Sequence, residues 1–343
     1  MKEKVKNILD YSAITYLGIV FILCLFPHFI LGLLGLDIDV HLKAGSQSPA
    51  WNVAEVFGRD NLGRSILAMM INGAKFSLAI SIFSATLATV IGVFLGAFSG
   101  FFGDNALKVT LGNSLLLILL VPINFYYIGL ATNLDPLEGV LLVSGCLLLS
   151  LLVWWLIDAA FRKLSIFQRK MSVPVDFVQM KFVEILYAIP TYFVLLALAG
   201  IFKPSVQSLV VIIGITSWPM TALLLRTEML KIREMDFVHA LKLAGVPWYR
   251  ILFRHAIPNA ISPVVVDFLF FASGLLVIES TLSFIGIGLP GEIISWGKIL
   301  ASFKHNSASW WTALFPGIII FLTVLSFHRV GRMVKIKYSF TSH

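Results

Sequence analysis

The chain has 343 residues, of which 58% are hydrophobic and only 13% are charged. Soluble domains average about 25% charged residues, so the composition excludes an ordinary soluble protein and indicates an integral membrane protein. The formal net charge of +8 is better explained by a membrane than by a nucleic-acid partner, because the basic residues fall in loops beside apolar runs, as in the cytoplasmic loops of membrane proteins.

Apolar runs follow one another along the chain. A membrane-spanning helix needs about 20 mostly apolar residues, and such runs are expected at about 12–36, 76–100, 111–132, 138–157, 183–201, 207–226, 261–285 and 311–330. The first run is too long for a signal peptide and lacks a small-residue cleavage site, so it is expected to remain as a span. Cys24 and Cys146 each lie inside an apolar run, which predicts neither a disulfide nor a metal site.

Glycine and proline residues predict how three of these runs behave. Gly92, Gly96 and Gly100 in the second run form a small-xxx-small row, which predicts close packing against another helix. Pro190 is expected to break the fifth run and Pro219 the sixth, because proline removes a helical hydrogen bond.

The basic residues predict which side of the membrane each loop occupies. Most of the 26 Lys and Arg residues fall in 1–10, 161–181, 226–256 and 329–337. Since cytoplasmic loops carry the excess of Lys and Arg, these segments and both termini are expected in the cytoplasm. An even number of spans is then required, and the runs above give about eight. The fold class is therefore predicted to be an all-α polytopic membrane protein.

The longest basic segment between two apolar ones runs from Arg233 to Pro263. It is interpreted as two short helical runs separated at Gly245-Val246-Pro247. Gly245 is expected to adopt a positive φ, Pro247 to lie in the first turn of the second run, and Pro258 to end that run. Apolar residues at helical spacing give each run one apolar stripe, formed by Ala240, Leu241 and Ala244 in the first and by Ile251, Leu252 and Ile257 in the second.

This segment resembles the cytoplasmic coupling loop of ABC importer permeases, whose pattern is E-A-A, three residues, Gly, nine residues and I-x-L-P. Gly245 holds the glycine position, Ala240 the first alanine, and Ile257-Pro258 the closing pair. His239 and Leu241 depart from the pattern, since the family has Glu and a second alanine there. The string FRHAIPNAISP is typical of the second membrane subunit of the dipeptide, oligopeptide and nickel branch. The alternative is an ordinary amphipathic loop on the membrane surface.

Further motifs of this family follow in order along the chain. Gly58 to Ser65 resembles the G-T-D-x-L-G-R-D signature just outside the second span, and Val175 to Pro190 is similar to the V-D-x-x-x-M-R-x-x-D-I-x-x-A-x-P pattern, with Glu184 in place of an Asp. The match is completed by Gly73-Ala74-Lys75-Phe76-Ser77-Leu78, Gly100-Phe101-Phe102-Gly103, Leu282-Ser283-Phe284, Ser295-Trp296-Gly297 and Phe315-Pro316-Gly317. The resemblance covers roughly 55–103 and 175–331.

The resemblance implies the type I permease fold of ABC importers, with a six-span core. Residues from about 104–174 have no place in that pattern and are interpreted as an inserted two-span hairpin, which either faces lipid or docks an accessory subunit. The implied organisation is an N-terminal span with an extracytoplasmic segment (1–72), a permease transmembrane domain (73–331) that contains the coupling loop (233–258), and a cytoplasmic tail (332–343).

The resemblance also implies a function, which is to form the translocation pathway of an ATP-driven importer in the cell (inner) membrane. The solute would be a di- or oligopeptide or a related small molecule. The implied partners are a homologous second permease, two ABC ATPase subunits, an extracytoplasmic solute-binding protein and the lipid bilayer. The sequence has no G-x-x-x-x-G-K-[ST] loop and no catalytic constellation. The chain is therefore expected to be no enzyme and to hold no metal or cofactor, with ATP bound by its partners.

The residues expected to couple the chain to the ATPase are His239, Ala240, Gly245, Arg250, Ile257 and Pro258. For two of them a second interpretation stays open. His239 could simply fill a polar interface position. Arg250, together with Arg254 and His255, could face anionic lipid headgroups instead of acidic residues of the ATPase.

Two carboxylates fall inside the seventh apolar run. A charge at the bilayer centre costs about 2.5–3.5 kcal/mol, so Asp267 and Glu279 are candidates for lining the pathway or contacting the partner permease. The alternative is a carboxylate hydrogen-bonded between helices, which is favoured for Glu279 near the outer end of the run. Two other functions stay open: a secondary transporter driven by protons through these acids, and a membrane scaffold subunit that uses the inserted hairpin as its interface.

Overall fold

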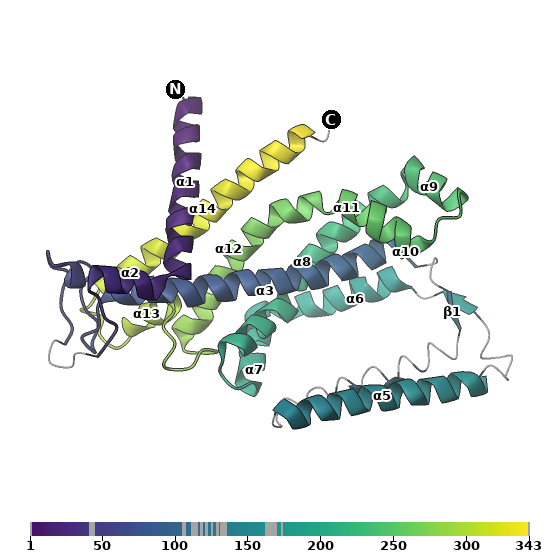
Figure 1. Cartoon of the computed structure of the whole chain (residues 1–343), viewed down its shortest axis with the longest axis horizontal. Helices are drawn as coiled ribbons and strands as arrows, with labels where there is room; N and C mark the ends of the chain where they lie inside the picture. Colours follow the sequence, from purple (N-terminus) through teal and green to yellow (C-terminus); the bar gives the residue numbers. More distant parts are fainter. Residues whose placement is uncertain are drawn as a thin grey trace. The chain divides into compact units, whose positions relative to one another are not determined.

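The computed structural model describes residues 2–40, 45–104, 108–110, 136–161, 170–172 and 174–341, with scattered positions between 116 and 130. In this part of the chain the structure is helical apart from one short pair of strands (Figure 1). The elements are α1 (Lys2–Leu25), α2 (Pro27–Leu34), a 3-10 turn (Val53–Glu55), α3 (Ile66–Phe102), β1 (Lys108–Thr110), α5 (Pro136–Phe161), β2 (Lys170–Ser172), α6 (Val175–Ala188), α7 (Thr191–Ile201), α8 (Val206–Arg233), α9 (Asp236–Leu243), α10 (Trp248–Ile251), a π turn (Leu252–Ala256), α11 (Ile257–Ala260), α12 (Ser262–Ile285), α13 (Trp296–Ser302) and α14 (Trp311–Thr341).

The apolar helices agree with the predicted spans. Five described helices are long and apolar enough to cross a membrane, and the number rises to seven if each of two bent helix pairs is one span. These seven coincide with seven of the predicted runs, so the polytopic all-α class is confirmed. The remaining predicted run, at 111–132, lies largely outside the described residues.

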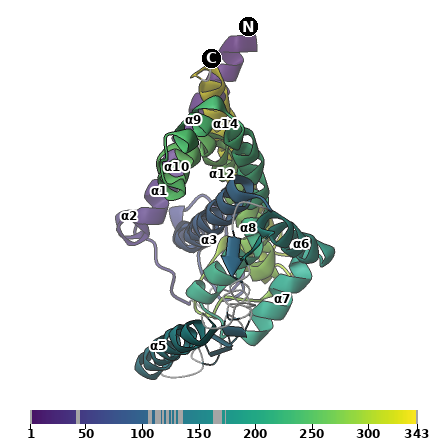
Figure 2. The same cartoon turned by 90° about the vertical axis from the view of Figure 1, so that its right-hand side faces the viewer.

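The two prolines expected to break spans behave differently. α6 and α7 are bent by 86° where Pro190 separates them, which confirms the first break (Figure 2). The expected break at Pro219 is wrong, because α8 continues through this residue. Pro219 is buried among neighbouring side chains, and packing of this kind holds a membrane helix together where proline frees a backbone carbonyl.

The chain divides into two compact units, one of Met1–Phe101 with Lys181–His343 and the other of Phe102–Met180. The second unit contains the residues expected as an insertion. Its strands β1 and β2 pair antiparallel, with Val109 opposite Met171. None of the apolar stretch of α5 is buried, an exposure that both interpretations of the insertion require.

In the first unit, α3 extends between two groups of short helices. The α9, α10 and α11 helices lie near one end of it and α13 near the other (Figure 1). Three glycines let α3 lie directly against α8, since a Cβ at Gly96 would stand 2.4 Å from the carbonyl oxygen of Ala222, and one at Gly100 would stand 2.7 Å from that of Arg226. The close packing predicted for this glycine row is confirmed.

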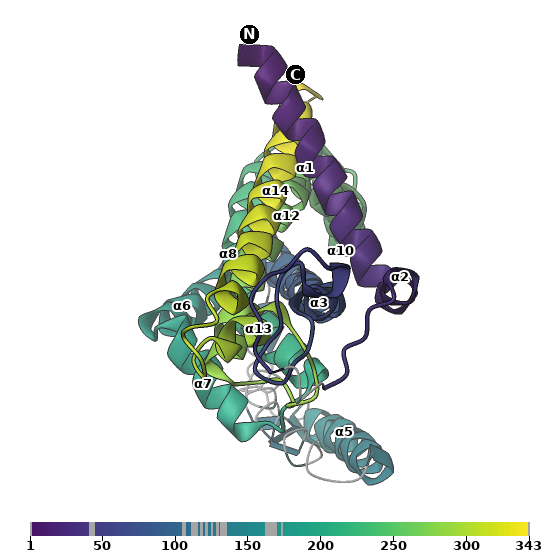
Figure 3. The same ribbon diagram turned by 90° about the vertical axis from the view of Figure 1, so that its left-hand side faces the viewer.

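The remaining long helices of the first unit pack through α14. This helix contacts both α1 and α12 (Figure 3). The hydroxyl of Tyr16 in α1 lies 3.1 Å from the carbonyl oxygen of Ile319 and donates to it. Between α13 and α3, the fully buried Trp296 of α13 donates its ring N–H to the carbonyl oxygen of Met70 at 2.9 Å. These contacts hold α1 on α14 and α13 on α3.

Candidate functional site

The α9–α11 segment, from Asp236 to Ala260, is the part of the structure that corresponds to the predicted coupling loop. Asp236 lies in the first turn of α9 and Lys242 in the last, where each suits the helix dipole. Val238 is the buried residue of this helix. Two residues of the predicted apolar stripe, Ala240 and Ala244, are exposed and Leu241 is half-buried, so this stripe is not part of the packed core. The helix is anchored through Val238 and lies near one end of α3 (Figure 1).

Gly245 ends α9 in the way that the sequence predicts. Its φ is +73°, in the left-handed region that glycine occupies without steric cost. Its N–H donates to the carbonyl oxygen of Lys242 at 3.1 Å, and the N–H of Val246 donates to that of Leu241 at 3.1 Å. This pair of bonds is a Schellman motif, which satisfies the last carbonyls of a helix and reverses the chain.

The second helical run differs from the prediction at both of its prolines. Pro247 precedes α10 as its N-cap instead of lying within the first turn. Pro258 does not end the run, because a π turn precedes it and α11 contains it. The N–H of Ile257 donates to the carbonyl oxygen of Leu252 across five residues, so Pro258 falls in the first turn of a new helix, where its missing N–H is not needed. The chain is therefore almost continuously helical from Trp248 into α12.

One face of the α9–α11 segment rests on the rest of the first unit. The ring of Phe98 in α3 lies 6.4 Å from the ring of Trp248 and 6.3 Å from that of Phe253, measured between centroids. The Nζ atom of Lys242 lies 5.9 Å from the ring centroid of Phe101. The residues buried on this face are Ile251, Leu252, Ala256 and Ala260. The segment thus contacts the last turns of α3 through aromatic rings.

The same segment also leaves large apolar side chains exposed. Leu243 is 89% exposed, Tyr249 51%, and Trp248 and Phe253 each 47%. We call these four residues the outward face. An exposed apolar surface surrounded by polar residues marks an interaction site. The sequence prediction missed these residues, although large apolar side chains inside a basic loop are the signal that could have found them.

Five of the six predicted coupling residues are exposed, and Ile257 is half-buried. The exposed ones are His239, Ala240, Gly245, Arg250 and Pro258. The surface around them is charged. At the end of α8 the side chain of Arg233 donates to the carboxylate of Glu234 at 3.0 Å. This hydrogen bond, and then the positive charge of Arg233, hold the pKa of Glu234 below its usual value. Charged groups therefore lie beside the outward face.

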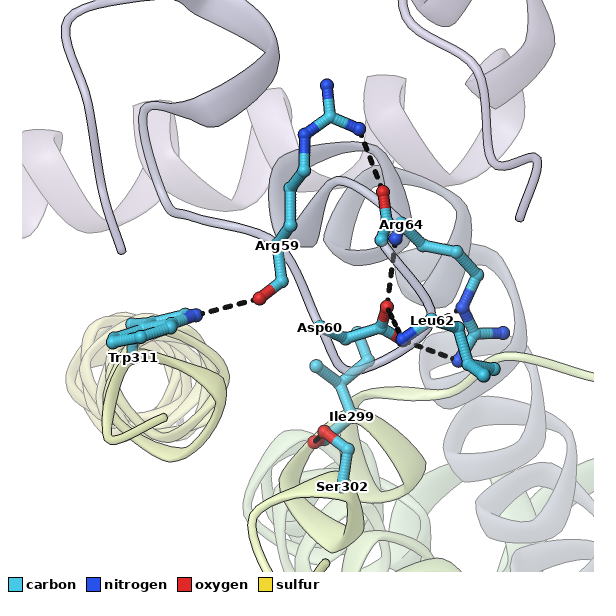
Figure 4. Close-up of polar contacts among 8 residues, drawn as sticks. Arg59, Asp60, Leu62, Arg64, Ile299, Ser302 and Trp311 are labelled. Carbon is cyan, nitrogen blue, oxygen red and sulfur yellow. Dashed lines mark hydrogen bonds and ion pairs between the residues drawn. The ribbon is translucent and has the colours of Figure 1, made fainter. Parts of the chain in front are cut away.

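At the other end of α3, the Gly58–Ser65 turn forms the motif recognised from the sequence (Figure 4). Asp60 is 1% exposed. Its Oδ1 accepts from the N–H groups of Leu62 and Arg64 at 3.0 and 2.8 Å, and its Oδ2 accepts two bonds from the Arg64 guanidinium at 2.7 and 2.8 Å. Trp311 donates its ring N–H to the carbonyl oxygen of Arg59 at 3.0 Å. The turn is therefore held by its own polar groups and by α14.

Glu279 lies fully buried inside the first unit. Its Oε1 accepts from the Ser283 hydroxyl at 2.8 Å and its Oε2 from the Ser280 hydroxyl at 3.3 Å. Ser77 of α3 and Ser295 at the start of α13 also lie close to this carboxylate. A carboxylate enclosed by four serines from three segments joins helices. The structure thus corrects the expectation that Glu279 lines a pathway and agrees with the alternative raised for it.

Asp267 has a different environment from Glu279. It is half-buried in the second turn of α12. Lys335 of α14 lies close enough to act on its charge. The two acids predicted as a pair are therefore not brought together, and only Asp267 keeps an exposed surface that a pathway or a second subunit could use.

Comparison with known proteins agrees with this geometry. Residues 164–337, about half of the chain, match the family described as binding-protein-dependent transport system inner membrane component. A protein of Brucella ovis named as a peptide permease is 26% identical over 296 residues, which cover 85% of this chain and 74% of the relative.

Two further relatives have similar names. The dipeptide transport system permease protein DppC of Alkalihalophilus pseudofirmus is 25% identical over 276 residues, covering 80% of this chain and 68% of the relative. A protein of Brucella suis named as a peptide transport system permease is 34% identical over 157 residues, covering 46% and 53%. These proteins are membrane subunits of transporters, and theirs is not an enzyme family. This chain belongs to the family of binding-protein-dependent transport system inner membrane components, the permeases of ABC importers.

Proposed function

We propose that the chain forms, together with a homologous second permease, the translocation pathway of an ATP-driven importer for di- or oligopeptides or a related small solute. The family and the names of the relatives support the class of transporter and the class of solute. The observation that carries the proposal is the outward face, which exposes four large apolar side chains, with Leu243 at 89%.

The outward face is the docking surface for an ABC ATPase subunit. Aromatic side chains are enriched at protein interfaces because they bury a large area at little entropic cost. Arg250 and Lys242 are exposed in the same segment and would pair with acidic side chains of the ATPase. Two such subunits serve the two permeases, and they bind the ATP, since the sequence of this chain has no phosphate-binding loop.

Movement of the ATPases reaches the membrane helices by two routes. The first is the nearly unbroken helical path from α10 through the π turn and α11 into α12. The second is the aromatic contact of Trp248 and Phe253 with Phe98 of α3. A displaced α9–α11 segment therefore changes the positions of α12 and α3 and switches the pathway between outward and inward access. The nucleotide state selects between these conformations by its different binding energy for each.

The roles of the other surfaces follow from the orientation of the chain in the membrane. The distribution of Lys and Arg supports cytoplasmic termini and a cytoplasmic α9–α11 segment. The outer segments 37–74 and 286–309 then meet the extracytoplasmic solute-binding protein. Asp267, half-buried in α12, would face the pathway or the second permease.

Leu243→Glu tests the proposal, because Leu243 is 89% exposed and its replacement should leave the fold intact. The change should prevent copurification of the ATPase and abolish ATP-dependent peptide uptake in proteoliposomes. Val53→Glu is the matched control for copurification of the ATPase, since Val53 is 54% exposed in the outer segment and the substitution also places a carboxylate in water. Uptake and copurification that survive Leu243→Glu would contradict the proposal, and uptake that needs a proton gradient but no ATP would favour a secondary transporter.

A further inference from the structure

A cavity of about 450 Å³ opens beside the Gly58–Ser65 turn, at the end of α3 opposite the α9–α11 segment. The turn forms one wall through Asp60, Leu62 and Arg64. The facing wall comes from the chain around α13, with Ile293, Lys298 and Ser302. Figure 4 shows Leu62 and Arg64 on the turn, with Ser302 on the neighbouring helix. The cavity therefore lies between two segments that are far apart in the sequence.

The cavity carries a positive charge that no described carboxylate neutralises. Arg64 is paired with Asp60 at 2.7 Å, and the side chain of Asp60 is only 2% exposed. Lys298 donates from Nζ to the carbonyl oxygen of Pro290. Within the described part of the chain, no carboxylate lies within ion-pairing distance of it. His305 adds a second nitrogen donor to the lining.

The cationic side chains also interact with each other. Partial burial, and then the nearby charge of Arg64, lower the pKa of Lys298 from its usual value. An anion in the cavity would relieve both effects, because it would supply an opposite charge where burial has removed water. Lys298 therefore lacks an oppositely charged partner among the described residues, and a negatively charged group of a ligand would supply one.

The size and the walls of the cavity indicate a small molecule. Ligand pockets typically enclose about 300–1,000 Å³ and combine apolar walls with a few placed polar groups. Here Leu62, Met69 and Ile294 supply apolar surface, and Lys298 and Arg64 supply the charged donors. A single acidic side chain of a docking protein would occupy only part of this volume.

We propose that this cavity is a solute subsite, in which Lys298 and Arg64 bind the carboxylate of a small molecule such as a short peptide while the apolar walls contact its carbon atoms. The choice of a peptide rests on the proposed function, whereas the preference for a carboxylate rests on the cavity alone. The permease would then select solutes at its outer side.

Equilibrium binding of labelled dialanine and of dialanine amide tests this subsite. The full chain is used in lipid nanodiscs, with any transporter subunits that copurify. The wild-type chain should bind dialanine about tenfold more tightly than the amide, since a charge-assisted hydrogen bond contributes roughly this factor. Lys298→Gln should remove that preference, and Lys298→Arg should keep it.

Lys304→Gln is the matched control. Lys304 lies six residues further along and is exposed, and its Nζ donates to the carbonyl oxygen of Phe284 at 2.5 Å, outside the cavity. This variant loses the same charge and should keep the preference for the carboxylate. Thermal melting of all three variants verifies that they fold.

Two results would overturn the subsite. One is equal binding of dialanine and its amide by the wild-type chain, which would leave an acidic side chain of a protein partner as the occupant. The other is an equal effect of Lys298→Gln and Lys304→Gln. Because binding needs no ATP, these results are independent of the Leu243→Glu experiment, and a failure of one proposal is distinguishable from a failure of the other.

Discussion

The α9–α11 segment and the Gly58–Ser65 turn lie at opposite ends of α3. The turn uses its polar side chains in hydrogen bonds within the chain, whereas the segment leaves large apolar side chains exposed. The turn closes on itself: Asp60 is buried with four hydrogen bonds, and Trp311 of α14 donates a bond to the backbone of Arg59. The α9–α11 segment leaves Leu243, Tyr249, Trp248 and Phe253 exposed. The comparison shows that Asp60 of the turn is paired within this chain, whereas the exposed side chains of the segment agree with the proposed docking of another protein.

Gly245→Pro, in the α9–α11 segment, should have the largest effect, which is a loss of solute uptake. Proline fixes φ near −65°, while Gly245 has a φ of +73° and donates its N–H to Lys242. The substitution should therefore disrupt the end of α9 and abolish solute uptake, although the chain still inserts into the membrane. Uptake into proteoliposomes measures this effect. Gly245→Ala is the graded control, because nothing lies within 4 Å of its new Cβ and only the strain of about 1–2 kcal/mol remains. Unchanged uptake in Gly245→Pro would refute the role of the segment.

Asp60→Ala should have the next largest effect, and at the opposite end. It leaves the N–H groups of Leu62 and Arg64 and the Arg64 guanidinium without the buried carboxylate that accepts from them. Removing one partner of a buried ion pair costs about 3–5 kcal/mol, so the free energy of unfolding and the melting temperature should fall. Copurification of the ATPase should not change.

Glu55→Ala provides the control for Asp60→Ala. Glu55 pairs with Arg59 at 3.2 Å but its side chain is 27% exposed, and partly exposed pairs contribute about 0–1 kcal/mol. Equal destabilisation by the two substitutions would mean that the turn is not held through Asp60.

Trp248→Ala should weaken ATPase binding by about thirtyfold, since a tryptophan at the centre of an interface commonly contributes about 2 kcal/mol or more. The ring also contacts Phe98 of α3, so transmission of movement should weaken as well. Titration of purified ATPase against the reconstituted permeases measures the affinity. Trp51→Ala removes a tryptophan that is fully exposed in the outer segment and should leave this affinity unchanged. If both substitutions act alike, the outward face is not the docking surface.

Glu234→Gln should have the smallest effect, and it should depend on pH. The pKa of Glu234 is lowered, chiefly by the hydrogen bond from Arg233. A lowered pKa in the folded chain stabilises it above the ordinary value of 4.5, and this stabilisation disappears as the pH falls through the lowered value. Thermal melting should therefore separate wild type from Glu234→Gln slightly at pH 7 and not in acid below the lowered pKa. A difference that grows in acid would contradict this assignment.

Local sequence patterns predicted those features that depend on one residue and its backbone. The positive φ of Gly245 and the bend at Pro190 are of this kind. Pro219 and Pro258 were mispredicted, because buried packing and a π turn compensate for the missing N–H in ways that no local pattern reveals. The stripe of Ala240, Leu241 and Ala244 likewise did not reveal how α9 packs, since the anchoring of this helix through Val238 depends on tertiary contacts.

The environments of charged side chains were the hardest to predict from the sequence. The four serines around Glu279 come from α3, α12 and the start of α13, so their convergence depends on the fold. Lys298 and Arg64 are likewise separated by more than 200 residues of chain and meet only across the cavity. Family resemblance could place the coupling loop, but it gave no indication of which side chains the loop exposes.

The nearly unbroken helical path from α10 to the end of α12 limits where residues can be inserted into this chain or deleted from it. Each residue of an α-helix advances the side-chain direction by about 100°. A single insertion between Ala260 and Glu279 would therefore turn the Glu279 carboxylate away from the serines of α3 and α13 that now lie beside it. Insertions and deletions along that path are therefore not compatible with this architecture.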